Sequence, residues 1–213
     1  MAFISVPAQW TSILDAVNLM IASLGEAPVT AYDPAPTNDV ALAIGALNFE
    51  DLMLQSQGWH WNREDAFQLS LGTGGTVTLP DECLRVTSAY YAPNNAPSGP
   101  IDIVQRGPLL YDRIGHTNVF TVAPVADLIL RLDWDSLPQV ARAVIALRAL
   151  QRFQGGVQQS QIALQLNAKD LAEAETLLEQ HEDEVAGYNS VYGNVSTQSA
   201  LYGAGGLRRN RGL

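Results

Sequence analysis

The sequence predicts an α+β fold: four principal helices, two N-terminal and two C-terminal, pack as a bundle, with a central small antiparallel β region and an extended C-terminal tail. Three observations predict it: helical periodicity at both ends of the chain, short extended runs between turn residues in the middle, and no periodicity after Gly187. The predicted parts are a helical pair (residues 1–58), a β-rich insertion domain (59–134), a helical pair that completes the bundle (135–186) and an extended arm (187–213).

The first helix is predicted over residues 12–24. Ser12 and Asp15 fit a capping box, in which each side chain satisfies a free backbone N–H of the first turn. Gly25 and Pro28 supply the stop signal, and a proline-rich loop follows. The apolar residues that recur on one face of this helix are Ile13, Val17, Met20, Ile21 and Leu24.

A second helix is capped by Thr37 or Asn38 and runs to about Gln57, where Gly58 ends it. Its apolar residues share one face, so the first two helices are expected to pack together. The residues of this face are Val40, Ile44, Leu47 and Leu54.

From Trp59 the pattern changes to short extended runs, which predict a small antiparallel sheet region. The glycines at 72–75 predict a hairpin turn, and the three prolines of 92–100 predict an exposed loop. Strands are expected at residues 67–71, 76–79, 83–91, 101–105, 109–111 and 126–132.

Helical periodicity returns at Ser136, which with Gln139 forms another possible capping box, and the third helix runs to Gly155. A fourth helix is expected over about residues 160–186. Its apolar seam is half-filled, so we expect helix packing rather than an autonomous coiled coil. The seam residues, one every seven, are Leu164, Leu171, Leu178 and Val185.

The chain is acidic, with 22 acidic and 12 basic residues among 213 and a net charge of −10 at pH 7. An acidic protein does not gain the counterion-release affinity that drives binding to nucleic acid, so we expect no specific nucleic-acid binding. After Glu184 there are no acidic residues. The three arginines in this stretch indicate a basic arm that engages an acidic protein surface, and they are Arg208, Arg209 and Arg211.

We expect no catalytic site, no metal and no cofactor. The histidines are far apart, and the nearest metal candidate is His181 with the three acids that follow it, where a solvated helix end is the simpler interpretation. The glycines at 72–75 lack the lysine of a phosphate-binding loop, and Cys83 has no nucleophile signature, so we interpret it as a buried thiol.

Polysaccharide degradation is the competing function. The acid pairs Asp133/Asp135 and Glu64/Asp65 could supply the two carboxylates of a glycoside hydrolase, although Asp135 also suits a helix N-terminus. Two tryptophans on one face of a predicted strand could form a platform on which sugar rings stack. The alternative role of these tryptophans is packing in the core or in an interface. These tryptophans are Trp59 and Trp61.

Neither export nor membrane insertion is expected. The first ten residues contain Pro7 and no Lys or Arg, which does not fit a signal peptide. The most apolar helical stretch, residues 140–150, is too short to cross a bilayer. We therefore expect synthesis in a cytoplasm and no membrane partner.

Four short motifs occur in order along the chain. They are NLMIASLGEAPV at 18–29, GWHWN at 58–62, LYDR at 110–113, and a helix at 133–153 that carries Pro138 and closes with QRF. This order resembles that of the tail tubular protein A family, the head-to-tail adaptors of short-tailed bacteriophages, over about residues 11–190. The matching signature residues are Asn18, Gly25, Glu26, Pro28, Gly58, Trp59, Trp61, Tyr111, Arg113, Pro138, Arg152 and Phe153.

The resemblance implies a structural virion protein of the tail, made in the host bacterial cytoplasm. It implies a dodecameric ring that binds the portal on one side and the tail nozzle, a tubular protein B-like partner, on the other, with a central channel for DNA ejection. Tail fibres are further candidate partners. The residues expected to bind these partners lie near the end of the chain and are Tyr188, Asn189, Tyr192, Tyr202, Arg208, Arg209 and Arg211.

Overall fold

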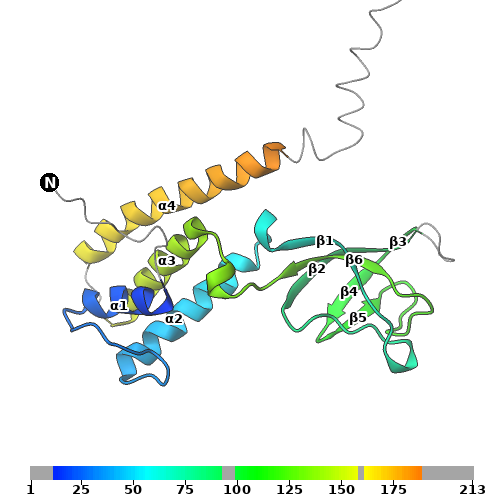
Figure 1. Cartoon of the computed structure of the whole chain (residues 1–213), viewed down its shortest axis with the longest axis horizontal. Helices are drawn as coiled ribbons and strands as arrows, with labels where there is room; N and C mark the ends of the chain where they lie inside the picture. Colours follow the sequence, from blue (N-terminus) through cyan, green and yellow to red (C-terminus); the bar gives the residue numbers. More distant parts are fainter. Residues whose placement is uncertain (1–11, 93–98, 158–160, 189–213) are drawn as a thin grey trace, which may run out of the picture.

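The α+β class is confirmed in the computed structural model, which describes residues 12–92, 99–157 and 161–188. Figure 1 shows an elongated molecule with the helices at one end and the strands at the other. Among the described helices, none combines the length and the apolar character that crossing a membrane requires.

Four helices form the larger end of the molecule. Helix α2 packs against α1 and α3, and α4 lies along α3. The predicted capping box is present, because the Asp15 backbone N–H donates to Ser12 Oγ (3.2 Å) and the Ser12 N–H donates to Asp15 Oδ2 (2.9 Å). Thr37 caps the second helix. The bounds are α1 Ile13–Ser23, α2 Asn38–Gln55, α3 Gln139–Val157 and α4 Gln161–Tyr188.

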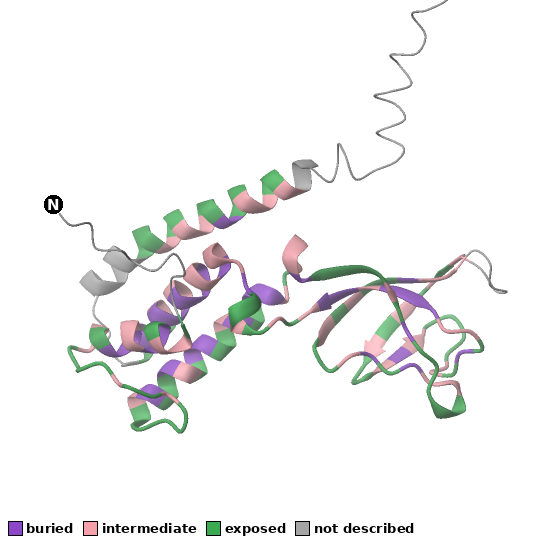
Figure 2. Cartoon of the chain, in the orientation of Figure 1, coloured by how far each residue is buried: buried purple, intermediate pink, exposed green. Residues whose placement is uncertain are grey.

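The core of the bundle is continuous across the four helices. Fully buried side chains come from α1 (Met20 and Ile21), α2 (Leu54), α3 (Ile145) and α4 (Leu178). Burying a large aliphatic side chain stabilises the fold by about 1.5–3 kcal/mol, so these contacts account for the association of the helices. Figure 2 shows the buried residues on the facing sides of the helices.

Six strands form the smaller end. Strands β1, β6, β2 and β3 make one antiparallel sheet in that order, and β4 pairs with β5 as a separate hairpin. A second core lies here, and Val77, Leu110, Phe120 and Leu128 are buried in it. The bounds are β1 Arg63–Gln68, β2 Cys83–Tyr91, β3 Gly99–Ile101, β4 Ile103–Arg106, β5 Leu109–Asp112 and β6 Val125–Leu130.

Three short 3-10 helices complete the described chain: η1 His60–Asn62, η2 Thr73–Gly75 and η3 Trp134–Ser136. The predicted turn at 72–75 is confirmed, because η2 lies there and Leu71 bridges Val77 across it. The expected strand at 76–79 is wrong, because its residues make only isolated bridges to three different segments.

The predicted start of the third helix is also wrong. Helix α3 begins at Gln139, and Ser136 ends η3 instead of capping α3. Leu137, the residue before Pro138, is held extended (φ −74°, ψ 144°), as residues before proline usually are. The Pro138 carbonyl then accepts from the Arg142 N–H (3.1 Å), so the helix can start only after the proline.

The expected strand at 101–105 is divided at Asp102. The Asp102 carbonyl accepts from the Arg113 N–H (2.9 Å), which separates β3 from β4 and lets them join different sheets. The first strand likewise begins earlier than predicted, at Arg63.

Candidate functional site

The two ends of the molecule are joined through two buried amide side chains, Gln55 at the end of α2 and Asn62 in η1. Gln55 Nε2 donates to the Leu132 carbonyl (3.0 Å), and Gln55 Oε1 accepts from the Leu132 N–H (2.7 Å). Asn62 Nδ2 donates to the carbonyls of Gln55 (2.7 Å) and Leu130 (3.0 Å). Because buried polar groups without partners are costly, this network fixes α2 to the exit of β6.

The glycine of the GWHWN motif allows close approach at this junction. Gly58 has φ +83°, and a Cβ placed there would lie 2.3 Å from Ile129 Cδ1 of β6. A glycine at this position therefore lets α2 end directly against the sheet.

The two tryptophans of the motif pack against the helical core. Their rings stack at a centroid distance of 6.5 Å and an interplanar angle of 4°, and both side chains are half-buried. The Nε1–H of Trp59 donates to the Leu54 carbonyl (2.8 Å). Trp61 is in η1, so the expectation of a strand face is wrong, because the Asn62 side chain accepts from the Trp59 N–H (2.9 Å) and closes a turn. This arrangement favours packing over a sugar platform.

Helix α4 is attached to the same junction. The His60 backbone N–H donates to Glu182 Oε1 (2.9 Å), and the His60 ring hydrogen-bonds the other carboxylate oxygen. The His181 ring lies 5.3 Å from the His60 ring. The metal candidate around His181 is thus a helix-docking contact. Across the described ranges, no group of three or more His, Cys, Asp or Glu residues could hold a metal ion.

The first family motif shapes the loop after α1. Asn18 Nδ2 donates to the Val29 carbonyl (3.0 Å), and Asn18 Oδ1 accepts from the Val29 N–H (2.7 Å). This pair of bonds holds the returning loop against the helix, and Gly25 (φ +80°) follows the C-terminus of α1. Glu26 and Pro28 are exposed in the loop.

Other signature residues make ion pairs and ring contacts at the surface or pack in the core. The Arg106 guanidinium lies 3.5 Å from the centroid of the Tyr111 ring, and Arg113 pairs with Asp102 (3.4 Å). In α3, Arg152 Nε donates to Glu50 Oε1 (2.6 Å), while Phe153 is buried in the helical core.

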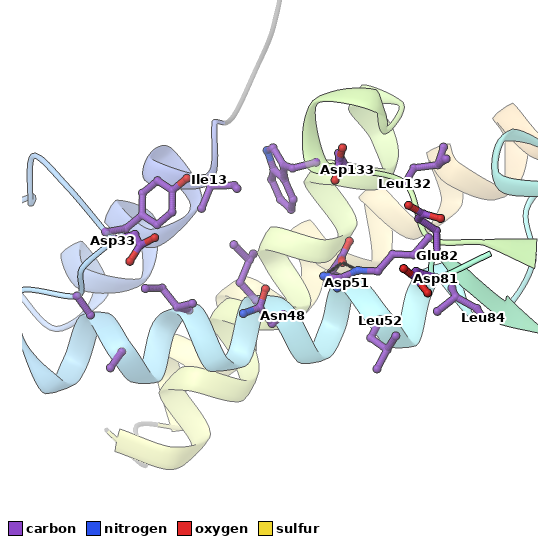
Figure 3. A pocket seen from close by; sticks show the side chains of 17 residues that line it. Ile13, Asp33, Asn48, Asp51, Leu52, Asp81, Glu82, Leu84, Leu132 and Asp133 are labelled. Atoms are coloured by element: carbon purple, nitrogen blue, oxygen red, sulfur yellow. Dashed lines mark hydrogen bonds and ion pairs between the residues drawn. The ribbon is translucent and has the colours of Figure 1, made fainter. Parts of the chain in front are cut away.

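A pocket of about 920 Å³ lies beside α2, next to the start of β2 and to η3 (Figure 3). Asp51 accepts from Arg131 through two hydrogen bonds (3.0 and 2.8 Å), so this buried carboxylate is neutralised. The lining contains one guanidinium and an excess of carboxylates, which makes it an acidic recess. The carboxylates are Asp33, Asp51, Asp81, Glu82 and Asp133.

Both acid pairs considered for hydrolysis consist of exposed residues. Asp133 lines the acidic recess, and Asp135 belongs to η3. On exposed strand β1, Asp65 accepts from Arg63 Nε (2.7 Å) beside Glu64.

Burial raises the pKa of the Cys83 thiol, which keeps it protonated and disfavours nucleophilic chemistry.

The residues expected to bind partners are placed only in part. Tyr188 is the last residue of α4. The remaining ones fall outside the described residues, and they are Asn189, Tyr192, Tyr202, Arg208, Arg209 and Arg211.

A model of a known family matches most of the chain. It is named Tube, is described as a tail tubular protein and matches residues 14–188, a range that runs from the second residue of α1 to the end of α4. None of the curated proteins compared with the chain matches it.

Proposed function

The chain belongs to the tail tubular protein family, is a structural protein of a phage tail, and, we propose, acts there as the adaptor between the portal and the tail nozzle. In this proposal, copies of the chain form a dodecameric ring with a central channel through which DNA leaves the capsid. The protein is made in the host bacterial cytoplasm and is incorporated into the virion tail. The division of the chain after residues 58, 134 and 186 is part of the proposal.

The observation that carries the proposal is the role of the signature residues. Asn18, Gly58 and Phe153 fix a loop, a helix end and a core, and the two tryptophans of GWHWN pack against the bundle. These residues build a shape instead of a reactive centre, as expected of a subunit whose function is assembly.

The charge of the chain supports a role as a conduit. With a net charge of −10, a ring of identical subunits presents an acidic surface that repels phosphate and does not retain the passing duplex. The basic arm, with Tyr188, Asn189, Tyr192, Tyr202 and the three C-terminal arginines, is proposed to bind the neighbouring subunit or the portal, and tail fibres are further proposed neighbours.

The polysaccharide-degrading alternative is not proposed. It depended on paired carboxylates and on a tryptophan platform, whereas Trp59 and Trp61 pack against the helical core and Asp65 pairs with Arg63. In the acidic recess, the buried carboxylate of Asp51 is held by Arg131 and is therefore not free to act as an acid or a nucleophile.

The mass of the full chain by light scattering, alone and with the portal protein, tests the adaptor function. A ring-sized species in isolation or in the mixture is the expected result. A chain that stays monomeric in both conditions contradicts the proposal, and a screen for glycan cleavage then becomes the next measurement.

A further inference from the structure

Helix α2 is apolar on two opposite faces. One face packs in the bundle through Val40, Leu47 and Leu54. The other, here named the outer α2 face, consists of residues that recur three or four positions apart and is exposed to solvent. Its large side chains are Leu42 (55% exposed), Phe49 (44%) and Met53 (49%), and Leu52 (43%) lies at its border with the acidic recess.

A groove of about 370 Å³ runs along this face, between α2 and α3. Gly45 lies in it, so the backbone of α2 is accessible there. Its one charged lining residue is Arg152, whose guanidinium lies 3.7 Å from the centroid of the Phe49 ring and is bonded to Glu50. The other lining residues are Ala41, Leu42, Ala46, Phe153 and Gly156.

Helix α4 also has a recess on its outer side. Leu171 and Leu178 face the bundle, whereas Leu177 is 55% exposed on the other side, next to Thr176 and Glu173. The recess, of about 470 Å³, defines the outer α4 face. Its residues are Lys169, Ala172, Glu173, Thr176, Leu177 and Gln180.

Helices α2 and α4, which carry these two faces, lie on opposite sides of α3, which packs against both (Figure 1). A subunit with two different patches on opposite sides can bind the next copy head to tail, and such heterologous contacts generate rings when the rotation closes.

We propose that the outer α2 face of one copy packs against the outer α4 face of the next copy, with Arg152 close to Glu173. This inference rests on the proposed ring and names the contact that closes it. The helices have 18 and 28 residues, or about 27 and 42 Å at 1.5 Å per residue, so α4 can cover the whole of α2.

The exposed area supports a second copy as the occupant. An aromatic side chain covers roughly 150–250 Å², so four half-exposed side chains of at most this size present up to about 400 Å² of apolar surface. A stable interface buries about 800 Å² per partner, and monomers rarely expose apolar patches of more than a few hundred Å². The outer α2 face thus supplies about half of one side of a stable contact, and the groove lined by α3 residues extends it.

Full-length Phe49→Glu and Leu177→Glu test the contact from its two sides. Each is compared with the wild type by light scattering over a concentration series, alone and with the portal protein. We expect each variant to lose association by about tenfold or more. Ile114→Glu, at an apolar residue of the β end that is 76% exposed, is the matched control and is expected to associate like the wild type. Circular dichroism checks that every variant is folded.

An equimolar mixture of the two variants is the sharpest test. Phe49→Glu retains an intact α4 face and Leu177→Glu an intact α2 face, so one contact can form between them. The expected species is a dimer of one copy of each variant that grows no further, because both of its free faces carry the substitution.

Other outcomes distinguish a failure of the proposed α2–α4 contact from a failure of the proposed ring. Rings that form with Phe49→Glu or with Leu177→Glu overturn the contact and leave the adaptor function intact. A third result assigns the outer α2 face to the C-terminal arm and overturns the contact. In that case association is lost in Phe49→Glu and in a chain truncated after Tyr188, but is kept in Leu177→Glu. A wild type that stays monomeric in every condition overturns both proposals.

Discussion

The helical end and the β end differ in how they are stabilised. The helical end has the larger core, drawn from four helices, and it holds the motif residues Asn18, Trp59 and Phe153. The β end has a smaller core beneath a short sheet and a hairpin, and Ile114 and Val119 are exposed on it. The comparison indicates that the helical end and the junction determine the stability of the subunit, while the β end tolerates more change at its surface.

The largest expected effect is in the helical core. Phe153→Ala should lower the free energy of unfolding by about 3–5 kcal/mol, because a buried ring is replaced by a cavity. Phe120→Ala, at an equally buried phenylalanine of the β core, should cost less, because the smaller core can collapse more easily around the cavity. Urea unfolding followed by circular dichroism measures both values. A larger loss of stability in Phe120→Ala than in Phe153→Ala would show that the β core contributes more to stability than the helical core.

The junction is expected to come next. Gly58→Ala places a Cβ against Ile129 at a positive φ, and it should cost about 2–4 kcal/mol. Gly74→Ala is the matched control, since it has the same backbone conformation (φ +81°) and nothing within 4 Å of the added atom, so only the backbone strain of about 1–2 kcal/mol remains. Equal losses of stability in Gly58→Ala and Gly74→Ala, measured by thermal unfolding, would show that the close approach to β6 adds nothing to the cost of the substitution.

Removal of the buried amide tests whether the two ends unfold together. Asn62→Ala leaves the Trp59 N–H and the carbonyls of Gln55 and Leu130 without this partner, and it should cost about 1–3 kcal/mol. The wild type should unfold in one transition, and the variant should show the β end unfolding first. Asn48→Ala, at an exposed asparagine of α2, is the control and should change stability by less than about 0.5 kcal/mol. Coincident transitions in Asn62→Ala would mean that other contacts couple the ends.

The smallest effect is a pH dependence of the β end. Hydrogen bonds from the Ser88 hydroxyl and the Ala66 N–H lower the pKa of Asp127. A lowered pKa in the folded state contributes stability above the unfolded pKa of about 3.9, and this contribution is lost as the pH falls from there through the folded value. The unfolding midpoint of the wild type should therefore fall more than that of Asp127→Asn as the pH is lowered from about 5 through and below the unfolded pKa of about 3.9. Parallel midpoints would show that the carboxylate adds nothing to stability.

Local signals predicted much of the helical end. The Ser12 capping box, the Thr37 cap and the end of α2 before Gly58 each depend on a few neighbouring residues, and the structure has all three. The start of the third helix lies two residues later than a cap at Ser136 predicts, because Pro138 restricts Leu137 to an extended conformation.

The second apolar face of α2 has a sequence signal that one-face periodicity overlooks. Leu42, Phe49, Leu52 and Met53 lie between the core positions, so the helix is apolar nearly all round, a pattern that indicates burial on both sides. In the described single chain this second face is exposed, and this mismatch is what points to a partner.

By itself the sequence determined the α+β class, the order of the helices and the family motifs, because helix caps, periodicity and turn residues act over a few positions. Only the tertiary structure decided that Glu182 reaches His60, 122 residues away, and that Gln55 binds the backbone of Leu132. It also placed α2 and α4 on opposite sides of α3. Such contacts depend on how separate elements pack, and no spacing along the chain encodes them.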